Sequence, residues 1–306
     1  MKRKNIFFKN SKHAFRISLI IFIFTVLVLS VFLFLRYRKK HSSLPSPNEI
    51  ADMWNEQRYA DVYDASAQIL AKEPLNAEIL AIHGFSSYYL FSEETDKSLG
   101  YTYLSDCIAS LRKALIYVPE KEKQRISYIL GKAYYHKGYF YSNLALKYLD
   151  IAYEGDEKFD DLPEFRGMSA SLLKLPQKAI SAFTEALEDN PSDLVLFALA
   201  QNYLAINDTS NAKMYLSETI KKTEDILLEI DARYLLGTIF IDEGDIKKAE
   251  QEYLAILDKN ANSANAYYGL GLIYEIKGDL VKARAKWRKA LKIDPLHADT
   301  RMKLKL

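Results

Sequence analysis

Hydrophobic residues follow two different patterns along the 306-residue chain. The first pattern is an unbroken apolar run at residues 17–35, which has 19 residues and no charged side chain. The second begins near residue 49, where apolar residues recur every three or four positions in one segment after another. The two patterns predict an all-α protein in which one wholly hydrophobic helix precedes many amphipathic helices.

The apolar run at residues 17–35 predicts a transmembrane helix. A helix of 19 residues spans about 28 Å, which is close to the hydrocarbon thickness of a bilayer. A cleaved signal peptide has a shorter apolar core, about 7–15 residues, followed by a cleavage site of small residues. Because this run instead leads directly into basic residues at 36–40, we expect it to remain as a membrane anchor.

Basic residues flank the predicted anchor on both sides. Six Lys or Arg lie in the tail at residues 1–16, and four lie at residues 36–40. The more basic side of a span usually stays in the cytoplasm, so we expect the N-terminus inside and the folded part outside. In a bacterial cell this means the inner membrane and the periplasm. Residues 36–48, which are basic at first and then rich in Pro and Ser, predict a linker between anchor and folded part.

Small residues mark a repeat in the folded part. Their spacings are 47, 36, 33, 37 and 34 residues, at Gly84, Gly131, Gly167, Ala200, Gly237 and Gly271. The last copy is the clearest, with a Leu before the small residue, an aromatic residue after it, a turn, and then a second helix that ends near a proline: Leu270, Gly271, Tyr274, Gly278, Asp279, Ala283, Trp287 and Pro295. A fixed spacing in this range predicts an array of similar helical units.

This pattern resembles the tetratricopeptide repeat. The resemblance implies an α-solenoid, a superhelix of antiparallel helix hairpins, with about seven hairpins at residues 49–297 and a capping helix at residues 298–306. The 47-residue interval contains extra residues at about 91–100, which we expect to form a surface loop between the two helices of their hairpin.

The resemblance also implies how each hairpin packs. A small residue on the first helix lets the backbone of the second helix approach, and large residues of the second helix pack beside that contact. The residues expected to make these contacts are Gly131, Gly167, Ala200, Gly237 and Gly271 on first helices, and Ala283 and Trp287 on the last second helix.

No pattern in the sequence indicates catalysis or a bound cofactor. The motifs of phosphate-binding loops, dinucleotide-binding folds, zinc proteases and serine hydrolases are absent, and the five histidines are scattered without metal-ligand spacing. The single cysteine, Cys107, lies in a helical apolar pattern, which predicts a buried side chain. Outside residues 1–41 the chain has 32 basic and 40 acidic residues, so a nucleic-acid partner is not expected. We therefore expect a protein that is not an enzyme.

First helices of tetratricopeptide hairpins line an inner groove, so the resemblance implies a candidate site for a protein partner. The side chains placed there are mainly aromatic and aliphatic: Tyr128, Lys132, Tyr135, Phe197, Gln201, Leu204, Tyr234, Ile241, Tyr268, Leu272 and Glu275. Such a groove suits an amphipathic helix or an extended apolar peptide, whereas the repeated cations that bind acidic chaperone tails are missing. In the alternative interpretation, these residues simply pack between neighbouring hairpins.

The expected function is a membrane-anchored scaffold that holds proteins during assembly or stabilisation of a cell-envelope complex. The chain is similar in organisation to N-terminally anchored tetratricopeptide proteins of bacterial envelopes, including the collar proteins of spirochaete periplasmic flagella. A second hypothesis is an anchored transport receptor with its repeats in the cytosol. The last hairpin is strongly basic, which indicates either a solvated outer face or contact with anionic lipid or an acidic partner.

Overall fold

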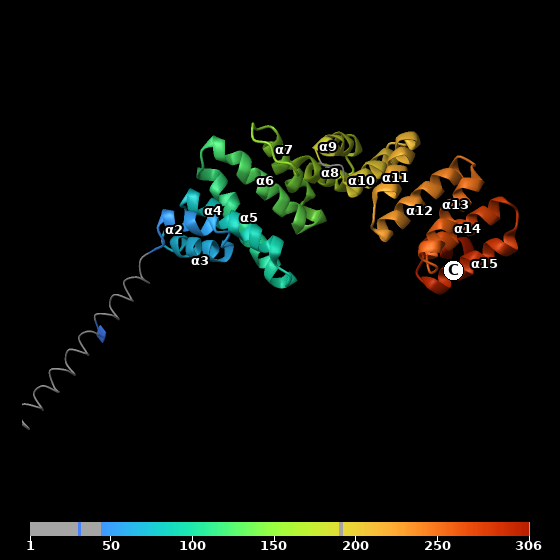
Figure 1. Cartoon of the computed structure of the whole chain (residues 1–306), viewed down its shortest axis with the longest axis horizontal. Helices are drawn as coiled ribbons and strands as arrows, with labels where there is room; N and C mark the ends of the chain where they lie inside the picture. The colour runs from blue at the N-terminus through green and yellow to red at the C-terminus, as the bar shows by residue number, and fades with distance from the viewer. Residues whose placement is uncertain (1–29, 32–43, 190–191, 306) are drawn as a thin grey trace, which may run out of the picture. The chain divides into compact units, whose positions relative to one another are not determined.

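The computed structural model describes residues 30–31, 44–189 and 192–305, and over these residues it contains fifteen α-helices, one short 3-10 helix and no strand (Figure 1). Among the described helices, none is long and apolar enough to cross a membrane. The predicted span at residues 17–35 lies outside the described residues, apart from Ser30 and Val31, which are helical. The expectation of an all-helical solenoid is confirmed, and the membrane anchor remains a prediction.

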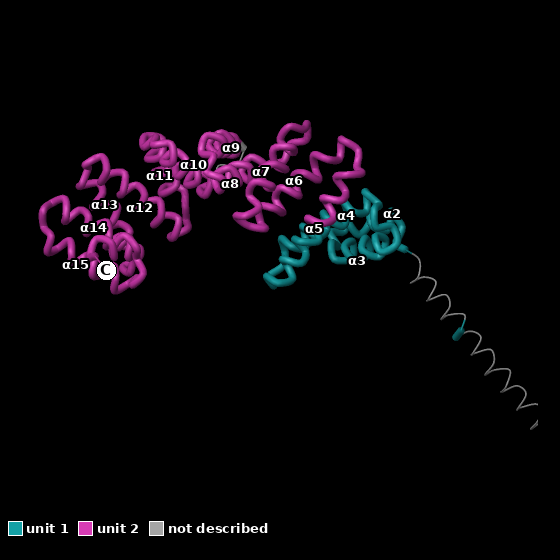
Figure 2. The backbone as a smooth tube through the Cα atoms, turned by 180° about the vertical axis from the view of Figure 1, so that it is seen from behind, with its two compact units in different colours: residues 1–106 teal, residues 107–306 magenta. Residues whose placement is uncertain are grey.

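The chain divides into two compact units, residues 1–106 and residues 107–306 (Figure 2). The first unit contains α2 (Pro47–Asn55), α3 (Tyr59–Leu70), α4 (Ala77–Glu93) and the first half of α5 (Lys97–Tyr117). Its core is an apolar cluster from α2, α3 and α4, made of Ile50, Val62, Ala65, Ile69 and Ile79.

Helix α2 starts earlier than the sequence pattern suggested. The linker was expected to extend to residue 48, but Pro47 and Asn48 form the first turn of α2. Ser46 caps this helix, because its hydroxyl accepts a hydrogen bond from the Glu49 N–H while the Glu49 carboxylate accepts one from the Ser46 N–H. Proline at the first helical position lacks only an N–H that would have no partner there, so it starts this helix rather than breaking it.

The extra residues at 91–100 do not form the expected surface loop. Helix α4 continues to Glu93 and α5 begins at Lys97, so only three residues lie between the two helices. The carboxylate of Asp96 accepts hydrogen bonds from the N–H groups of Ser98 and Leu99, which starts α5. The insertion therefore lengthens both helices of this hairpin.

The second unit is a stack of helical hairpins. Its elements after α5 are α6 (Glu120–Lys137), the 3-10 helix η1 (Tyr139–Tyr141), α7 (Ser142–Tyr153), α8 (Leu162–Leu172), α9 (Pro176–Asp189), α10 (Asp193–Ala205), α11 (Thr209–Lys222), α12 (Ile226–Asp242), α13 (Ile246–Lys259), α14 (Ala264–Ile276), α15 (Leu280–Ile293) and α16 (Ala298–Leu304). Each of these α-helices contacts the next one in sequence, and Figure 1 shows the hairpins following one another. The apolar clusters each join helices from adjacent hairpins, so the core continues along the stack.

The first helices of the hairpins form the more closely spaced layer of this unit. From α6 to α16, each α-helix contacts the next α-helix along the chain. Beyond these contacts, α6 contacts α8, α8 contacts α10, and α12 contacts α14. In the described part of the chain from α7 to α15, no comparable contact joins two successive second helices, and none joins α10 to α12. The first helices therefore lie on the inner side of the stack.

Turns within the hairpins position the second helices. Gly244 and Gly278 adopt φ values of 78° and 80°, in the left-handed region that favours glycine. The following residues, Asp245 and Asp279, then cap α13 and α15 by accepting hydrogen bonds from backbone N–H groups. In each Gly-Asp pair seen in the sequence, the glycine thus follows the end of the first helix and the aspartate caps the start of the second.

Candidate functional site

The glycines on first helices face large side chains of second helices. A Cβ added to Gly167 would lie 2.6 Å from the Phe183 ring, and one added to Gly237 would lie 2.9 Å from the Tyr253 ring. At Gly271 the distance to Trp287 Nε1 would be 2.2 Å. In each of these hairpins the absent Cβ makes room for a ring sixteen residues later in the chain.

This geometry corrects the expected reason for three of the small residues. They were expected to admit the backbone of the second helix, but the nearest atoms opposite Gly167, Gly237 and Gly271 belong to side chains. Ala200 is fully buried and belongs to one apolar cluster with Ala212 and Leu216 of its second helix. Ala283 and Trp287 are buried in the last hairpin. Gly131 instead faces Leu149, eighteen residues later, because the 3-10 helix adds residues to the turn of that hairpin. An added Cβ there would lie 3.0 Å from the Leu149 backbone N, so at Gly131 the backbone of the second helix does approach as expected.

Tyr128 and Lys132 of α6 are fastened to the next hairpin. The Tyr128 ring stacks on Phe159 with the ring centroids 4.1 Å apart, and its hydroxyl donates to Asp161. Lys132 donates to Asp161 Oδ2 at 2.6 Å and lies over the Phe165 ring. These two side chains thus hold the segment that leads into α8, rather than projecting freely from the inner layer.

Tyr135 also contacts the next first helix, α8. Its hydroxyl donates to the Met168 sulfur at 3.2 Å, and its ring meets Phe165 edge-on. Burial raises the pKa of Tyr135, and the negative charge of Glu164 raises it further. Burial likewise raises the pKa of Glu164, an effect that Asp161 strengthens and Lys132 opposes.

Helix α8 contributes residues that the sequence analysis missed. Glu164 and Met168 occupy the same positions relative to Gly167 as Tyr128 and Lys132 occupy relative to Gly131, three residues before and one after. Their regular offset from the small residue is the signal in the sequence that could have identified them. They add a carboxylate and a thioether to the inner layer.

Most of the other predicted groove residues pack between hairpins. Phe197 and Leu204 pack against the cluster that joins α10, α11 and α12, and Tyr234 and Ile241 pack against the cluster that joins α12, α13 and α14. Tyr268 lies beside His297, with the ring centroids 5.3 Å apart. The alternative interpretation, packing between neighbouring units, therefore describes much of what these side chains do.

A smaller part of the predicted set stays accessible on the inner layer. Gln201 is exposed and Leu272 is half-buried, while Glu275 accepts a hydrogen bond from Lys303 at 2.6 Å. The cations of α8 and α12 form ion pairs with carboxylates of this chain. Arg166 pairs with Asp150, and Arg233 pairs with Glu229 and Glu252. Helices α10 and α14 contain no Lys or Arg. From α8 to α14 the inner layer thus presents a mixed surface of aromatic, aliphatic, amide and carboxylate groups.

Cys107, singled out by the sequence, and His83, one of the five histidines, both lie in the core. Cys107 is fully buried, as predicted. His83 is buried in the first unit, where its Nδ1 lies 2.8 Å from the Ser66 hydroxyl and its ring stacks on Tyr63. Within residues 44–189 and 192–305, no group of three His, Cys, Asp or Glu residues lies close enough together to hold a metal ion.

Solved structures share this fold. The C-terminal part of a TPR repeat-containing protein from Cytophaga hutchinsonii superposes with a TM-score of 0.59 and 17% sequence identity, covering 85% of this chain and 99% of that one. A structure of MamA protein superposes with a TM-score of 0.50 and 21% identity, covering 61% of this chain and 97% of that one. At these identities the likeness concerns the fold alone. No curated protein matches the sequence.

A family model described as tetratricopeptide repeat matches the sequence twice, at residues 197–264 and 234–298. The matched region begins within α10 and extends through α15 to the start of α16. It includes the Gly237–Tyr253 and Gly271–Trp287 contacts described above. Residues 197–298, about a third of the chain, therefore carry a tetratricopeptide-repeat sequence signature, and the solved structures share the helical fold.

Proposed function

We propose that this chain is a membrane-anchored scaffold that holds protein partners on its inner layer of first helices and so helps to assemble or stabilise a cell-envelope complex. The accessible inner-layer residues are the main support, because Gln201, Leu272 and Glu164 retain surface that packing between hairpins does not cover. Stacked hairpins present such a surface on a rigid frame, as extended solenoid binding faces do. The apolar run at residues 17–35 supports the membrane part of the proposal.

A partner segment on this layer would combine apolar contact with hydrogen bonds. Leu272 and Met168 offer aliphatic and thioether surface, whereas Gln201 offers an amide and Glu164 a carboxylate. A peptide that is apolar on one side and carries hydrogen-bond donors matches this combination. The expected ligand is therefore less purely apolar than the sequence alone suggested.

Site-specific crosslinking in cells tests the inner layer as the binding face. Gln201 on α10 and Gln251 on α13 are both exposed glutamines, but Gln201 lies on a first helix and Gln251 on a second helix. With a photo-crosslinking amino acid at each position of the full chain, we expect a discrete adduct from position 201 and none from position 251. Phe197 and Tyr234 are less suitable probes, because truncating them also removes contacts from the core clusters.

The same pair of positions supplies the control. Both substitutions replace an exposed amide, so neither is expected to change the melting temperature. Equal adducts from the two positions, or an adduct from position 251 alone, would contradict the assignment of the binding face.

Reporter fusions test the proposed orientation. With the N-terminus in the cytoplasm, a reporter that needs export is expected to be active when fused after residue 306, and a reporter that works only in the cytosol is expected to be silent. The physical reason is the larger number of cations in residues 1–16 than in residues 36–40. The opposite result would favour the transport receptor with cytosolic repeats.

A further inference from the structure

The last complete hairpin separates its charges between its two helices. Helix α15 carries six Lys or Arg residues and no Asp or Glu, whereas α14 carries one carboxylate, Glu275, and no Lys or Arg. Other second helices mix the two signs, as α13 does with three lysines and three carboxylates. The six cations of α15 are Lys282, Arg284, Lys286, Arg288, Lys289 and Lys292.

Half of these cations interact within the hairpin. Lys282 pairs with the capping residue Asp279 at 3.0 Å. Lys286 and Lys289 lie over the Tyr267 ring, at 5.5 and 5.7 Å from its centroid. These contacts orient the three lysine side chains along the flank of α15 that borders α14.

The other three cations form a separate row. Arg284, Arg288 and Lys292 are exposed, and no hydrogen bond or ion pair to them is present among the described residues. Their spacing of four residues places them on one side of the helix, about 6 Å apart from one to the next. Like charges at this spacing destabilise a helix slightly, and among the described residues no carboxylate is paired with them. Binding of an anionic partner is therefore expected to be favourable, because it neutralises the repulsion between these cations.

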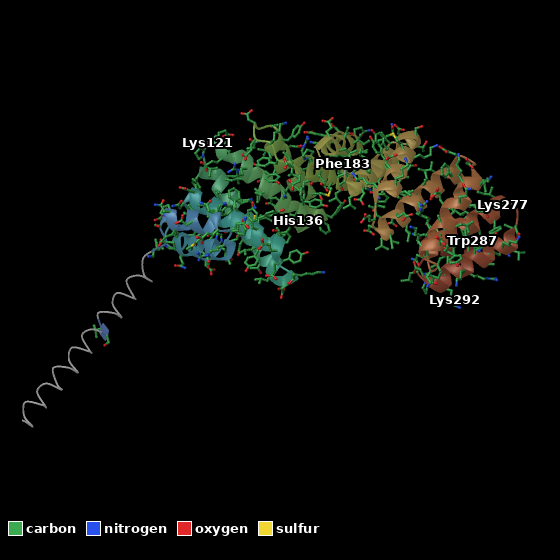
Figure 3. All side chains as sticks on the ribbon, viewed as in Figure 1. Lys121, His136, Phe183, Lys277, Trp287 and Lys292 are labelled. Atoms are coloured by element: carbon green, nitrogen blue, oxygen red, sulfur yellow. The ribbon has the colours of Figure 1, made fainter. Side chains whose placement is uncertain are left out.

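Apolar side chains adjoin the row at the start of α15. Val281 is 81% exposed, and Leu280 and Ile276 are 52% and 53% exposed. Val281 lies three residues before Arg284 and seven before Arg288, so it shares their side of the helix. The opposite side of α15 is buried through Ala283, Trp287 and Ala290. Figure 3 shows this hairpin, with Lys277 at its turn and Trp287 and Lys292 on α15.

We propose that this exposed face of α15 docks on an anionic lipid bilayer surface. Arg284, Arg288 and Lys292 would contact headgroup phosphates, while Val281 would enter the boundary between headgroups and acyl chains. Surface helices that bind membranes combine a cationic face with apolar residues in this way. The docking face lies on a second helix, so it leaves the inner layer free for a protein partner.

Charge and apolar exposure together favour a lipid surface over other anions. Nucleic acid is disfavoured because the chain outside residues 1–41 has a net charge of −8, and because Val281 would have no role beside a phosphate backbone. An acidic polypeptide could satisfy the cations, but a straight row on a rigid helix matches a flat charged surface. Binding to anionic vesicles and binding to polyglutamate separate these partners.

The experiment follows contact between α15 and vesicles directly. An environment-sensitive fluorophore is attached to the variant Ala285→Cys of the full chain, since Ala285 is exposed between Val281 and Arg288 and the native Cys107 is fully buried. The chain is held in nanodiscs of phosphatidylcholine, so that residues 17–35 are accommodated. Acceptor vesicles are either phosphatidylcholine alone or phosphatidylcholine and phosphatidylglycerol in equal parts.

We expect a blue shift and a rise in fluorescence with the phosphatidylglycerol vesicles only. Each Lys or Arg near an anionic leaflet contributes about fivefold in affinity, so Arg284→Gln, Arg288→Gln and Lys292→Gln together are expected to raise the half-saturating lipid concentration about a hundredfold. A matched control removes three exposed lysines elsewhere, Lys121→Gln, Lys158→Gln and Lys247→Gln, and is expected to bind like the unaltered chain. The basic residues 1–41 are common to all variants.

Three outcomes would overturn the proposal. They are an equal response to both vesicle types, an equal loss in the control variant, and a response to polyglutamate but not to phosphatidylglycerol vesicles, which would identify an acidic protein as the partner. Circular dichroism checks that the row variant folds, and its melting temperature is expected to be unchanged or slightly higher because like-charge repulsion is removed.

Discussion

Replacing Tyr253 by alanine is expected to lower the free energy of unfolding by about 3–5 kcal/mol, the range for truncating a large buried ring. Tyr253 is 1% exposed, and its ring lies between Gly237 of its own hairpin and Gly269 of the next one. Cβ atoms added at these glycines would lie 2.9 and 2.4 Å from the ring. Because the two glycines have no side chains, neither can fill the cavity that truncation leaves.

The loss should extend to two hairpins. Solenoid stability is the sum of unit and interface contributions, and Tyr253 belongs to both an intra-hairpin contact and an interface. Denaturant unfolding followed by circular dichroism measures the free energy, and hydrogen exchange locates the loss. We expect weaker protection in α12, α13 and α14. Tyr253→Phe is the control, since it removes only a hydroxyl 3.4 Å from Thr238 and is expected to cost about 1 kcal/mol or less. Similar losses in the two variants would contradict the role assigned to the ring.

Gly271→Leu is expected to destabilise the last hairpin by about 1–3 kcal/mol, because the new side chain overpacks a filled site. The Cβ alone would lie 2.2 Å from Trp287 Nε1, an atom that also donates a hydrogen bond to the Tyr268 carbonyl at 3.3 Å. The indole ring must therefore move, and that hydrogen bond is lost with it. The melting temperature of the full chain reports the effect.

Gly100→Ala provides the matched comparison for this prediction. Gly100 is also helical, but a Cβ there would have its nearest neighbour at 3.7 Å, which is an ordinary contact distance. Alanine is favoured over glycine in a helix by about 1 kcal/mol, so this substitution is expected to be neutral or stabilising. If both substitutions shifted the melting temperature in the same direction, the packing role of Gly271 would be refuted.

The repeat spacing in the sequence was sufficient to predict the hairpin fold. Small residues at Gly167, Ala200, Gly237 and Gly271 recur because each first helix needs space for a large side chain of its second helix, and that need depends only on local sequence. The spacing could not distinguish a loop from longer helices at residues 91–100. Polar residues on a solvated helix surface look like a polar loop, and the cap at Asp96 became evident only from its hydrogen bonds.

The partners of the inner-layer side chains depended on tertiary structure. Tyr128 and Lys132 lie on the predicted helix face, yet their contacts are Phe159 and Asp161, about thirty residues later in an irregular segment before α8. Helical periodicity assigns a residue to a face of its own helix, because that depends on backbone geometry alone. Whether such a residue stays open to a partner depends on how the next hairpin is rotated against it, and that rotation results from packing between units. The packing of successive hairpins therefore leaves Gln201 exposed and Tyr128 partly buried.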